Sequence, residues 1–83
     1  MYQIFLSNKA EKDLKKLDKI YRLKVGKSID FLVNNPLAGA KMGGEYKDSY
    51  RIKIPPLRII YTPDIKNKII WIRAIGFRGG VYK

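Results

Sequence analysis

The apolar residues of this chain change their spacing once, and that change limits the fold more than any other feature. Between residues 8 and 33 the apolar side chains recur at helical spacing, whereas from residue 50 onward they alternate with polar ones. Asn34-Asn35-Pro36 separates the two patterns, because proline disfavours helical geometry in the residue before it. A helical N-terminal half followed by a sheet-forming C-terminal half is therefore predicted.

The helical half is expected to form two helices joined by a tight turn. Asn8 is followed by Glu11 three residues later, which is the spacing of a capping box and predicts a helix start at Asn8. The first helix is predicted to continue to about Leu17. The second covers roughly residues 19–33. Together they predict an antiparallel helical hairpin.

Four strands and one irregular segment are predicted around this hairpin. The strands are expected at residues 2–6, 50–54, 58–61 and 68–75. The glycine-rich connection at residues 37–48 leaves room for an irregular edge strand, and residues 63–67 form a polar turn. The last strand is the most apolar and is expected to be central. The order β-α-α-β-β-β predicts an α+β fold, with the hairpin on one face of a small, mostly antiparallel twisted sheet. The length of 83 residues predicts a single domain over residues 1–83.

The charge balance points to a polyanionic partner. The chain has 18 Lys and Arg against 7 Asp and Glu, for a net charge of +11. Such a field attracts polyanions at long range and raises association rates. Nucleic acid is the first candidate, an anionic membrane surface the second and an acidic protein the third.

Several classes of function find no support in the sequence. It contains no cysteine and no histidine, and it has no Walker A, Rossmann, zinc-ligand or Ser-His pattern, so neither a cofactor nor a metal is expected. Lys9 and Lys12 follow a short apolar start, unlike a signal peptide. No apolar run is long enough to cross a bilayer. A cytoplasmic protein without a membrane partner is therefore expected.

A set of cations in the sheet-forming half is the candidate site. Arg51 and Lys53 alternate with apolar residues, which places them on one strand face about 7 Å apart. Arg58 begins the next strand, and the last strand leads to Arg78 and Tyr82. Like charges pack closely only when an anion lies between them, so the pattern favours a phosphate site. The plainer alternative is a solvated strand face.

The absence of histidine also restricts the chemistry. Any cleavage must use lysine, arginine and tyrosine, which suit the positioning and charge stabilisation of a phosphate. The lysines of the first predicted helix include Lys12 and Lys16, which are candidate RNA contacts. Lysine-rich helix faces more often serve solubility. Trp71 is expected to be a packing residue, although an exposed tryptophan can stack on a base.

Three C-terminal segments resemble the RelE/ParE superfamily of toxins from toxin–antitoxin pairs. They are Tyr50–Ile54, residues 57–61 and residues 75–82. Their order and spacing, with the N-terminal strand, the basic hairpin and the Asn34-Asn35-Pro36 stop, extend the resemblance over nearly the whole chain. It implies a RelE-like fold and a cognate antitoxin. In the RelE branch the toxin enters the ribosomal A site, contacts ribosomal RNA, and cuts mRNA by attack of a ribose 2′-hydroxyl on the adjacent phosphate.

The resemblance also implies roles for individual residues. Lys53 would be the base or a phosphate clamp, with Arg51 beside it as an RNA contact. Arg58 would stabilise the pentacoordinate phosphate, and Arg78 would lie near the leaving oxygen. Tyr82 would stack on a base or assist proton transfer.

Two departures and two alternatives accompany this interpretation. Several RelE-like sequences carry histidine or lysine just before the last arginine, where this chain has Phe77, and Pro55-Pro56 fills the strand connection before Arg58. A ParE-like inhibitor of DNA gyrase without nuclease activity is the first alternative. The second is a basic RNA-binding module without toxicity.

Overall fold

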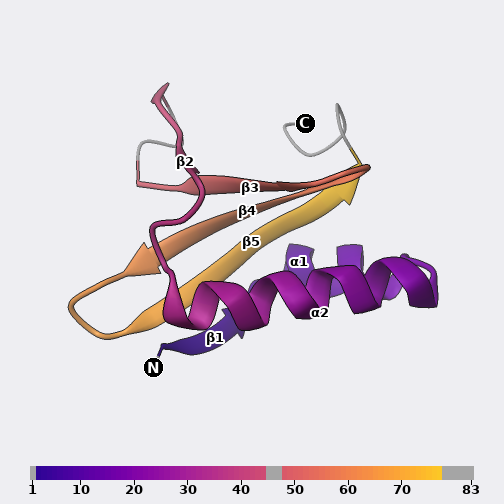
Figure 1. The fold of residues 1–83 in the computed structure, drawn as a ribbon, viewed down its shortest axis with the longest axis horizontal. Helices are drawn as coiled ribbons and strands as arrows, with labels where there is room; N and C mark the ends of the chain where they lie inside the picture. Colours follow the sequence, from indigo (N-terminus) through magenta and orange to yellow (C-terminus); the bar gives the residue numbers. More distant parts are fainter. Residues whose placement is uncertain (1, 45–47, 78–83) are drawn as a thin grey trace.

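The computed structural model describes residues 2–44 and 48–77. Its elements in chain order are β1 (Gln3–Leu6), α1 (Asn8–Lys15), α2 (Lys19–Asn34), β2 (Ala40–Lys41), β3 (Tyr50–Ile54), β4 (Leu57–Asp64) and β5 (Ile69–Phe77). The predicted α+β order is confirmed, and the edge strand for which the glycine-rich connection left room is the short β2 (Figure 1). No helix in the described ranges is long and apolar enough to span a bilayer.

The strands form one mixed sheet in the order β1-β5-β4-β3-β2. β1 pairs with β5 in parallel, and the other neighbours are antiparallel. The prediction that the last strand is central was wrong by one position. β5 is an interior strand between β1 and β4, but β4 lies in the middle of the sheet, because the short β2 extends the sheet on the far side of β3.

β4 is longer than the sequence pattern predicted. It runs through Pro63 to Asp64 and stays paired with β5 to its end, so the predicted turn begins later. The pairing of β3 with β4 starts only at Tyr50 and Tyr61. Pro63 therefore lies on a stretch of β4 beyond that pairing, and a proline is tolerated at such a strand edge because it needs no donor there.

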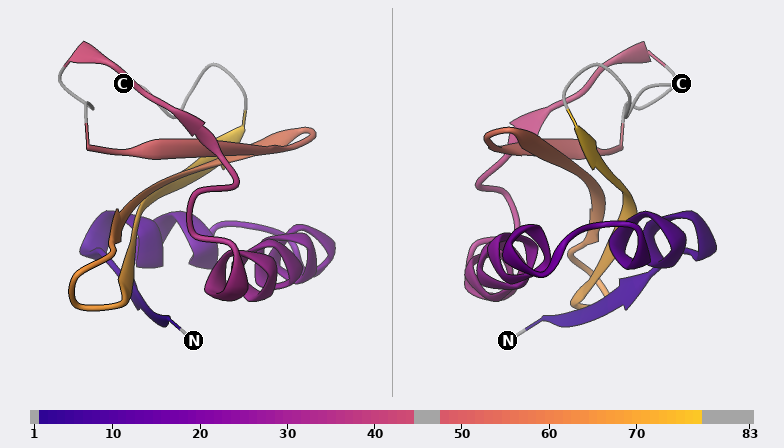
Figure 2. Two further views of the ribbon diagram at one scale, coloured as in Figure 1. Left: turned by 60° about the vertical axis from the view of Figure 1, so that its left-hand side comes forward. Right: turned by 90° about the vertical axis from the view of Figure 1, so that its right-hand side faces the viewer.

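Both helices cover the same face of the twisted sheet (Figure 2). The core between the two layers contains these residues, each at most 1% exposed: Ala10, Val25, Leu32, Leu57, Ile59, Tyr61, Ile70 and Ile72. Tyr50, Ile52 and Ile54 of β3 pack against this cluster. The predicted alternation of β3 is thus confirmed, and Arg51 and Lys53 leave the opposite, helix-free face.

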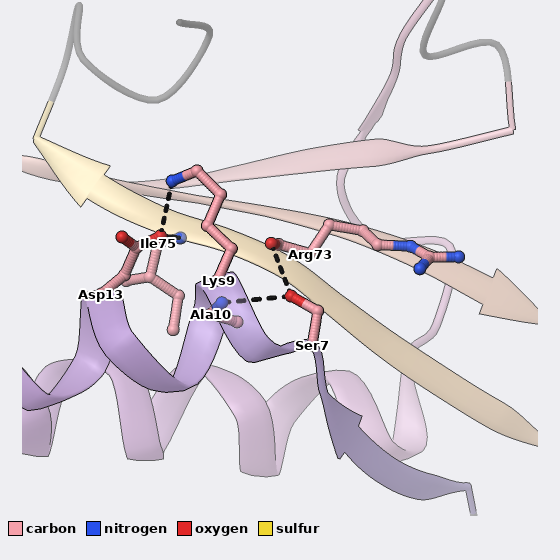
Figure 3. A network of polar contacts seen from close by, with 6 residues as sticks. All are labelled: Ser7, Lys9, Ala10, Asp13, Arg73 and Ile75. Atoms are coloured by element: carbon pink, nitrogen blue, oxygen red, sulfur yellow. Dashed lines mark hydrogen bonds and ion pairs between the residues drawn. The ribbon is translucent and has the colours of Figure 1, made fainter.

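Helix α1 starts at Asn8 as predicted, but its N-cap is the residue before it. The N-cap is Ser7, whose Oγ accepts a hydrogen bond from the backbone N–H of Ala10 at 3.1 Å. The same hydroxyl donates to the carbonyl oxygen of Arg73 at 2.8 Å (Figure 3). This second bond ties the cap to β5, which explains why Ser7 and not Asn8 takes the position. α1 also ends at Lys15, before Leu17.

A side chain of α1 continues the edge of β5 where β1 stops. β1 pairs with β5 only as far as Leu6 and Ile72. Beyond that point Asp13 Oδ2 accepts the backbone N–H of Ile75 at 3.0 Å and pairs with Lys9 Nζ at 2.9 Å (Figure 3). A buried strand N–H needs an acceptor, and Asp13 supplies it in place of a neighbouring strand.

Candidate functional site

The β3–β4 hairpin brings two of the predicted site residues together. Lys53 and Arg58 are direct cross-strand partners, so their side chains leave the same face from Cα atoms about 5 Å apart. Arg51 lies two residues along β3, opposite Ile60. The sequence left open whether Arg58 lies beside Arg51 or Lys53, and the register places it beside Lys53.

The two prolines do not displace Arg58. Pro55 and Pro56 are joined by a cis peptide bond and form the whole connection, because Ile54 and Leu57 on either side are already paired. Lys24 of α2 donates to the Pro55 carbonyl at 3.5 Å, which links the helix layer to the end of the hairpin.

Lys53 and Arg58 line a small cavity at this turn. Its volume is about 140 Å³, and the two prolines and Leu57 complete its wall. Pockets that take whole small-molecule ligands measure roughly 300–1,000 Å³, so this one suits a single group such as a phosphate. Lys53 is exposed and Arg58 half-buried. An anion here would reduce the repulsion between two adjacent cations.

The helix-free face is not simply a solvated face. Ile60 is 2% exposed and Ala74 5%, and Met42 packs against both. Arg51, half-buried, stands opposite Ile60 within this region. Arg51 therefore lies beside a covered apolar patch, which partly desolvates its surroundings and strengthens electrostatic interactions there.

Two predicted residues, Arg78 and Tyr82, lie outside the described residues. The last described pair of β5, Gly76 and Phe77, lies in register with Arg58 and Leu57 respectively. Phe77 packs edge-on against Tyr21 of α2, with ring centroids 5.4 Å apart. Phe77 thus belongs to the contact with the helix layer.

Lys12 and Lys16 are not part of this constellation. Both are exposed on or at the end of α1, which belongs to the helix layer, whereas Arg51, Lys53 and Arg58 are on the helix-free face. Their role as RNA contacts stays a prediction. No cluster of three His, Cys, Asp or Glu side chains that could ligate a metal occurs among residues 2–44 and 48–77.

The sequence interpretation did not anticipate a group of polar and aromatic side chains further along the same sheet. Arg73 lies over the ring of Trp71, with its Cζ 5.6 Å from the ring centroid. Its Nε donates to Thr62 Oγ1 at 3.2 Å. Nearby, the hydrogen bonds from Asn67 to Asp64 hold the pKa of that carboxyl below its ordinary value. Trp71 was the only signal of this group in the sequence, and it was interpreted as a packing residue, with stacking on a base as the alternative.

A pair of helices on one face of a five-stranded mixed sheet is also the architecture of solved RelE toxin structures. The model of the family described as ParE toxin of type II toxin–antitoxin systems matches residues 4–82. The chain belongs to this family, and it is a toxin of a toxin–antitoxin system with a RelE-like fold.

Solved structures of toxin–antitoxin complexes share the fold. The intact RelBE complex of Escherichia coli contains a chain 20% identical, with 93% of this chain and 96% of that chain covered and a TM-score of 0.81. A chain in the RelBE2 complex of Mycobacterium tuberculosis is 23% identical, with 93% of this chain and 98% of that chain covered and a TM-score of 0.82. A chain in the archaeal RelE–RelB complex of Pyrococcus horikoshii is 25% identical, with 96% of this chain and 98% of that chain covered and a TM-score of 0.80. A comparison with curated proteins found no match.

Proposed function

We propose that this toxin is a ribosome-dependent mRNA endonuclease. The observation that supports the proposal most directly is the pairing of Lys53 with Arg58 across the β3–β4 hairpin, where both line a cavity of about 140 Å³. Two cations held side by side by a rigid strand register suit a phosphate whose charge increases during reaction, because preorganised donors need no rearrangement when that charge develops.

The proposed reaction is an internal transesterification of RNA. The ribose 2′-oxygen forms a bond to the adjacent phosphorus, the bond from phosphorus to the 5′-oxygen breaks, and a cyclic phosphate and a free 5′-hydroxyl result. The proton of the 2′-hydroxyl passes to a base, for which Lys53 is the candidate, and the 5′-oxygen gains a proton. Arg58 stabilises the charge of the pentacoordinate phosphate, since its fork of N–H donors suits phosphate oxygens.

The proposed role of the ribosome is to align the substrate. Lysine and arginine are inefficient proton carriers at neutral pH, so most of the rate must come from aligning the 2′-oxygen with the phosphate. We infer that mRNA in the ribosomal A site is the substrate and that ribosomal RNA contacts the basic surface. Arg78 and Tyr82 are proposed to complete the site at the leaving oxygen and a neighbouring base.

A cognate antitoxin is the proposed protein partner. The three similar toxins named above were solved in complex with antitoxins. A net charge of +11 favours an acidic or amphipathic segment that covers the cationic face.

A cleavage assay on ribosome-bound mRNA tests the proposal. Arg58→Gln is expected to reduce cleavage by about 10²–10³-fold, the range observed when one donor to a developing oxyanion is removed. Arg22→Gln is the matched control, because Arg22 is an exposed arginine of α2 in the helix layer. Equal cleavage by both variants would exclude the proposed role of Arg58.

Inhibition of DNA gyrase is the second candidate function. The family model that matches the chain carries the name ParE, and this observation favours a ParE-like toxin that poisons gyrase by binding. A supercoiling assay separates the two activities. Inhibited supercoiling together with intact ribosome-bound mRNA would favour the ParE-like function, whereas cut mRNA with normal supercoiling would favour the endonuclease.

A further inference from the structure

A hollow of about 570 Å³ opens where the β4–β5 hairpin extends past the start of β3. The pairing of β3 with β4 begins at Tyr50 and Tyr61, and the hollow lies beside the following residues of β4, from Thr62 onward. The residues of its wall that matter below are Lys41, Asp48, Asp64, Lys66, Trp71 and Arg73. Its volume falls within the range of pockets that hold a nucleotide-sized ligand.

A series of side-chain contacts crosses the sheet at this hollow. Phe5 of β1 stacks on Trp71 of β5, with centroids 5.2 Å apart, and the Arg73 guanidinium lies over the Trp71 ring at 5.6 Å. Thr62 of β4 accepts from Arg73 Nε at 3.2 Å, and its hydroxyl is 2.9 Å from that of Ser49. The guanidinium is therefore held by an aromatic ring and a hydroxyl from two strands.

The backbone of Arg73 is fixed as well. The β4–β5 register passes from Ile60–Ala74 to Tyr61–Ile72, so Arg73 is the extra residue of a β-bulge. Its carbonyl accepts from Ser7 Oγ at 2.8 Å (Figure 3). β-bulges are often used to redirect a side chain. Arg73 is thus held at both its backbone and Nε, and its two terminal nitrogens carry four more N–H donors.

The charges of the hollow distinguish between possible ligands. Lys41, Lys66 and Arg73 supply three cations, whereas Asp48 and Asp64 supply two carboxylates. A peptide with several acidic residues would place carboxylates against carboxylates. One nucleotide carries a single phosphate for the cations, together with amino or hydroxyl groups that can donate to a carboxylate. Its base can stack on a guanidinium or an aromatic ring.

We propose that this hollow binds one nucleotide of a single-stranded RNA, with Arg73 as the contact to its phosphate or base and Trp71 as the support of Arg73. Arg58 and Thr62 are four residues apart on one face of β4, or roughly 13 Å. A nucleotide in the hollow would therefore belong to the same strand as the linkage held at Lys53 and Arg58. The inference rests on the proposed RNA substrate and adds a second subsite that positions it.

The only tryptophan of the chain, Trp71, reports on the hollow directly. The protein is titrated with a short single-stranded oligoribonucleotide while tryptophan emission is recorded. A saturable change in emission is expected, with an affinity that falls at least tenfold in Arg73→Gln and less than twofold in the matched control Arg22→Gln. Thr62→Val, which keeps the guanidinium but removes its anchor, is expected to weaken binding several-fold.

Three outcomes would overturn the inference. They are the absence of a saturable emission change, an equal loss of affinity in Arg73→Gln and Arg22→Gln, and an equal emission response to an acidic peptide of the same charge. The second would indicate attraction by net charge alone, and the third would make the hollow a protein-docking surface.

The readout is independent of cleavage. Arg58→Gln is expected to lose cleavage but retain the emission change. If the wild-type protein binds RNA in the hollow but leaves ribosome-bound mRNA intact, the endonuclease proposal fails and the subsite stands. If it cleaves mRNA while Trp71 does not respond, the subsite fails and the endonuclease proposal stands.

Discussion

Gly39→Ala is expected to destabilise the fold because the position has no room for a side chain. A Cβ at Gly39 would lie 2.5 Å from the carbonyl oxygen of Arg51 and 2.8 Å from the hydroxyl of Tyr61. The first obstacle is the backbone of β3, which cannot turn aside as a flexible side chain can. The Gly39 N–H also donates to the Tyr61 hydroxyl at 2.9 Å, and a shift of the loop would lengthen this bond.

The magnitude follows from these contacts. Overpacking of a tight site costs about 1–3 kcal/mol, and a weakened buried hydrogen bond adds about 0.5–1.5 kcal/mol. Alanine stiffens the unfolded chain, which offsets about 0.4–1 kcal/mol. A net loss of roughly 0.5–4 kcal/mol in the free energy of unfolding is expected, with a central value of about 2 kcal/mol. For a domain of 60–100 residues each kcal/mol lowers Tm by about 4–8 °C, so the central value lowers Tm by about 8–16 °C.

Urea denaturation of the wild-type protein, Gly39→Ala and Gly43→Ala measures the change in the free energy of unfolding. Gly43→Ala is the matched control, because no atom lies within 4 Å of an added Cβ at Gly43, and it should change the free energy of unfolding by no more than about 1 kcal/mol. Gly39→Ala should lower the midpoint without changing the slope. If Gly39→Ala unfolds at the same urea concentration as Gly43→Ala, the packing of this loop against β3 is incorrectly described.

Three further perturbations have defined outcomes. Ser7→Ala removes both the cap of α1 and the bond to the Arg73 carbonyl, and should cost about 1–2 kcal/mol in chemical denaturation; a loss below 0.5 kcal/mol would contradict this. The lowered pKa of Asp64 stabilises the fold above the carboxyl's unfolded pKa, and this stabilisation is lost as pH falls through the folded pKa. Asn67→Ala should raise the pKa of Asp64 in an NMR titration, and an unchanged value would refute the assignment of its cause. The complex with the antitoxin should weaken as salt is raised, and equal affinity at low and high salt would argue against an electrostatic contribution.

Local patterns predicted the elements well where neighbours in sequence decide the structure. The helical spacing and the Asn34-Asn35-Pro36 stop set α2, which ends at Asn34. Alternation in β3 correctly separated the core face from the face of Arg51 and Lys53. The adjacency of Lys53 and Arg58 was also within reach, because two antiparallel strands with a short connection leave few possible registers.

Features that depend on residues far apart in the sequence could not be predicted from local patterns. Ser7 is the cap of α1 because it also bonds to Arg73, 66 residues away. Ile75 has its acceptor in Asp13, 62 residues away. The bulge at Arg73 lies at the first of these bonds, two residues before the second, and has no local sequence signal. The hollow beside Trp71 was therefore not predicted, although all of its residues are present in the sequence.

The chemistry of the cut ends tests the central claim most directly. Ribosome-bound mRNA is incubated with the wild-type toxin, and the new 3′ and 5′ ends are identified by mass spectrometry. Attack by the 2′-hydroxyl at the cations of the β3–β4 hairpin predicts a 2′,3′-cyclic phosphate on one fragment and a free 5′-hydroxyl on the other. Fragments with a 3′-hydroxyl and a 5′-phosphate, or intact mRNA under conditions in which the toxin arrests growth, would contradict it.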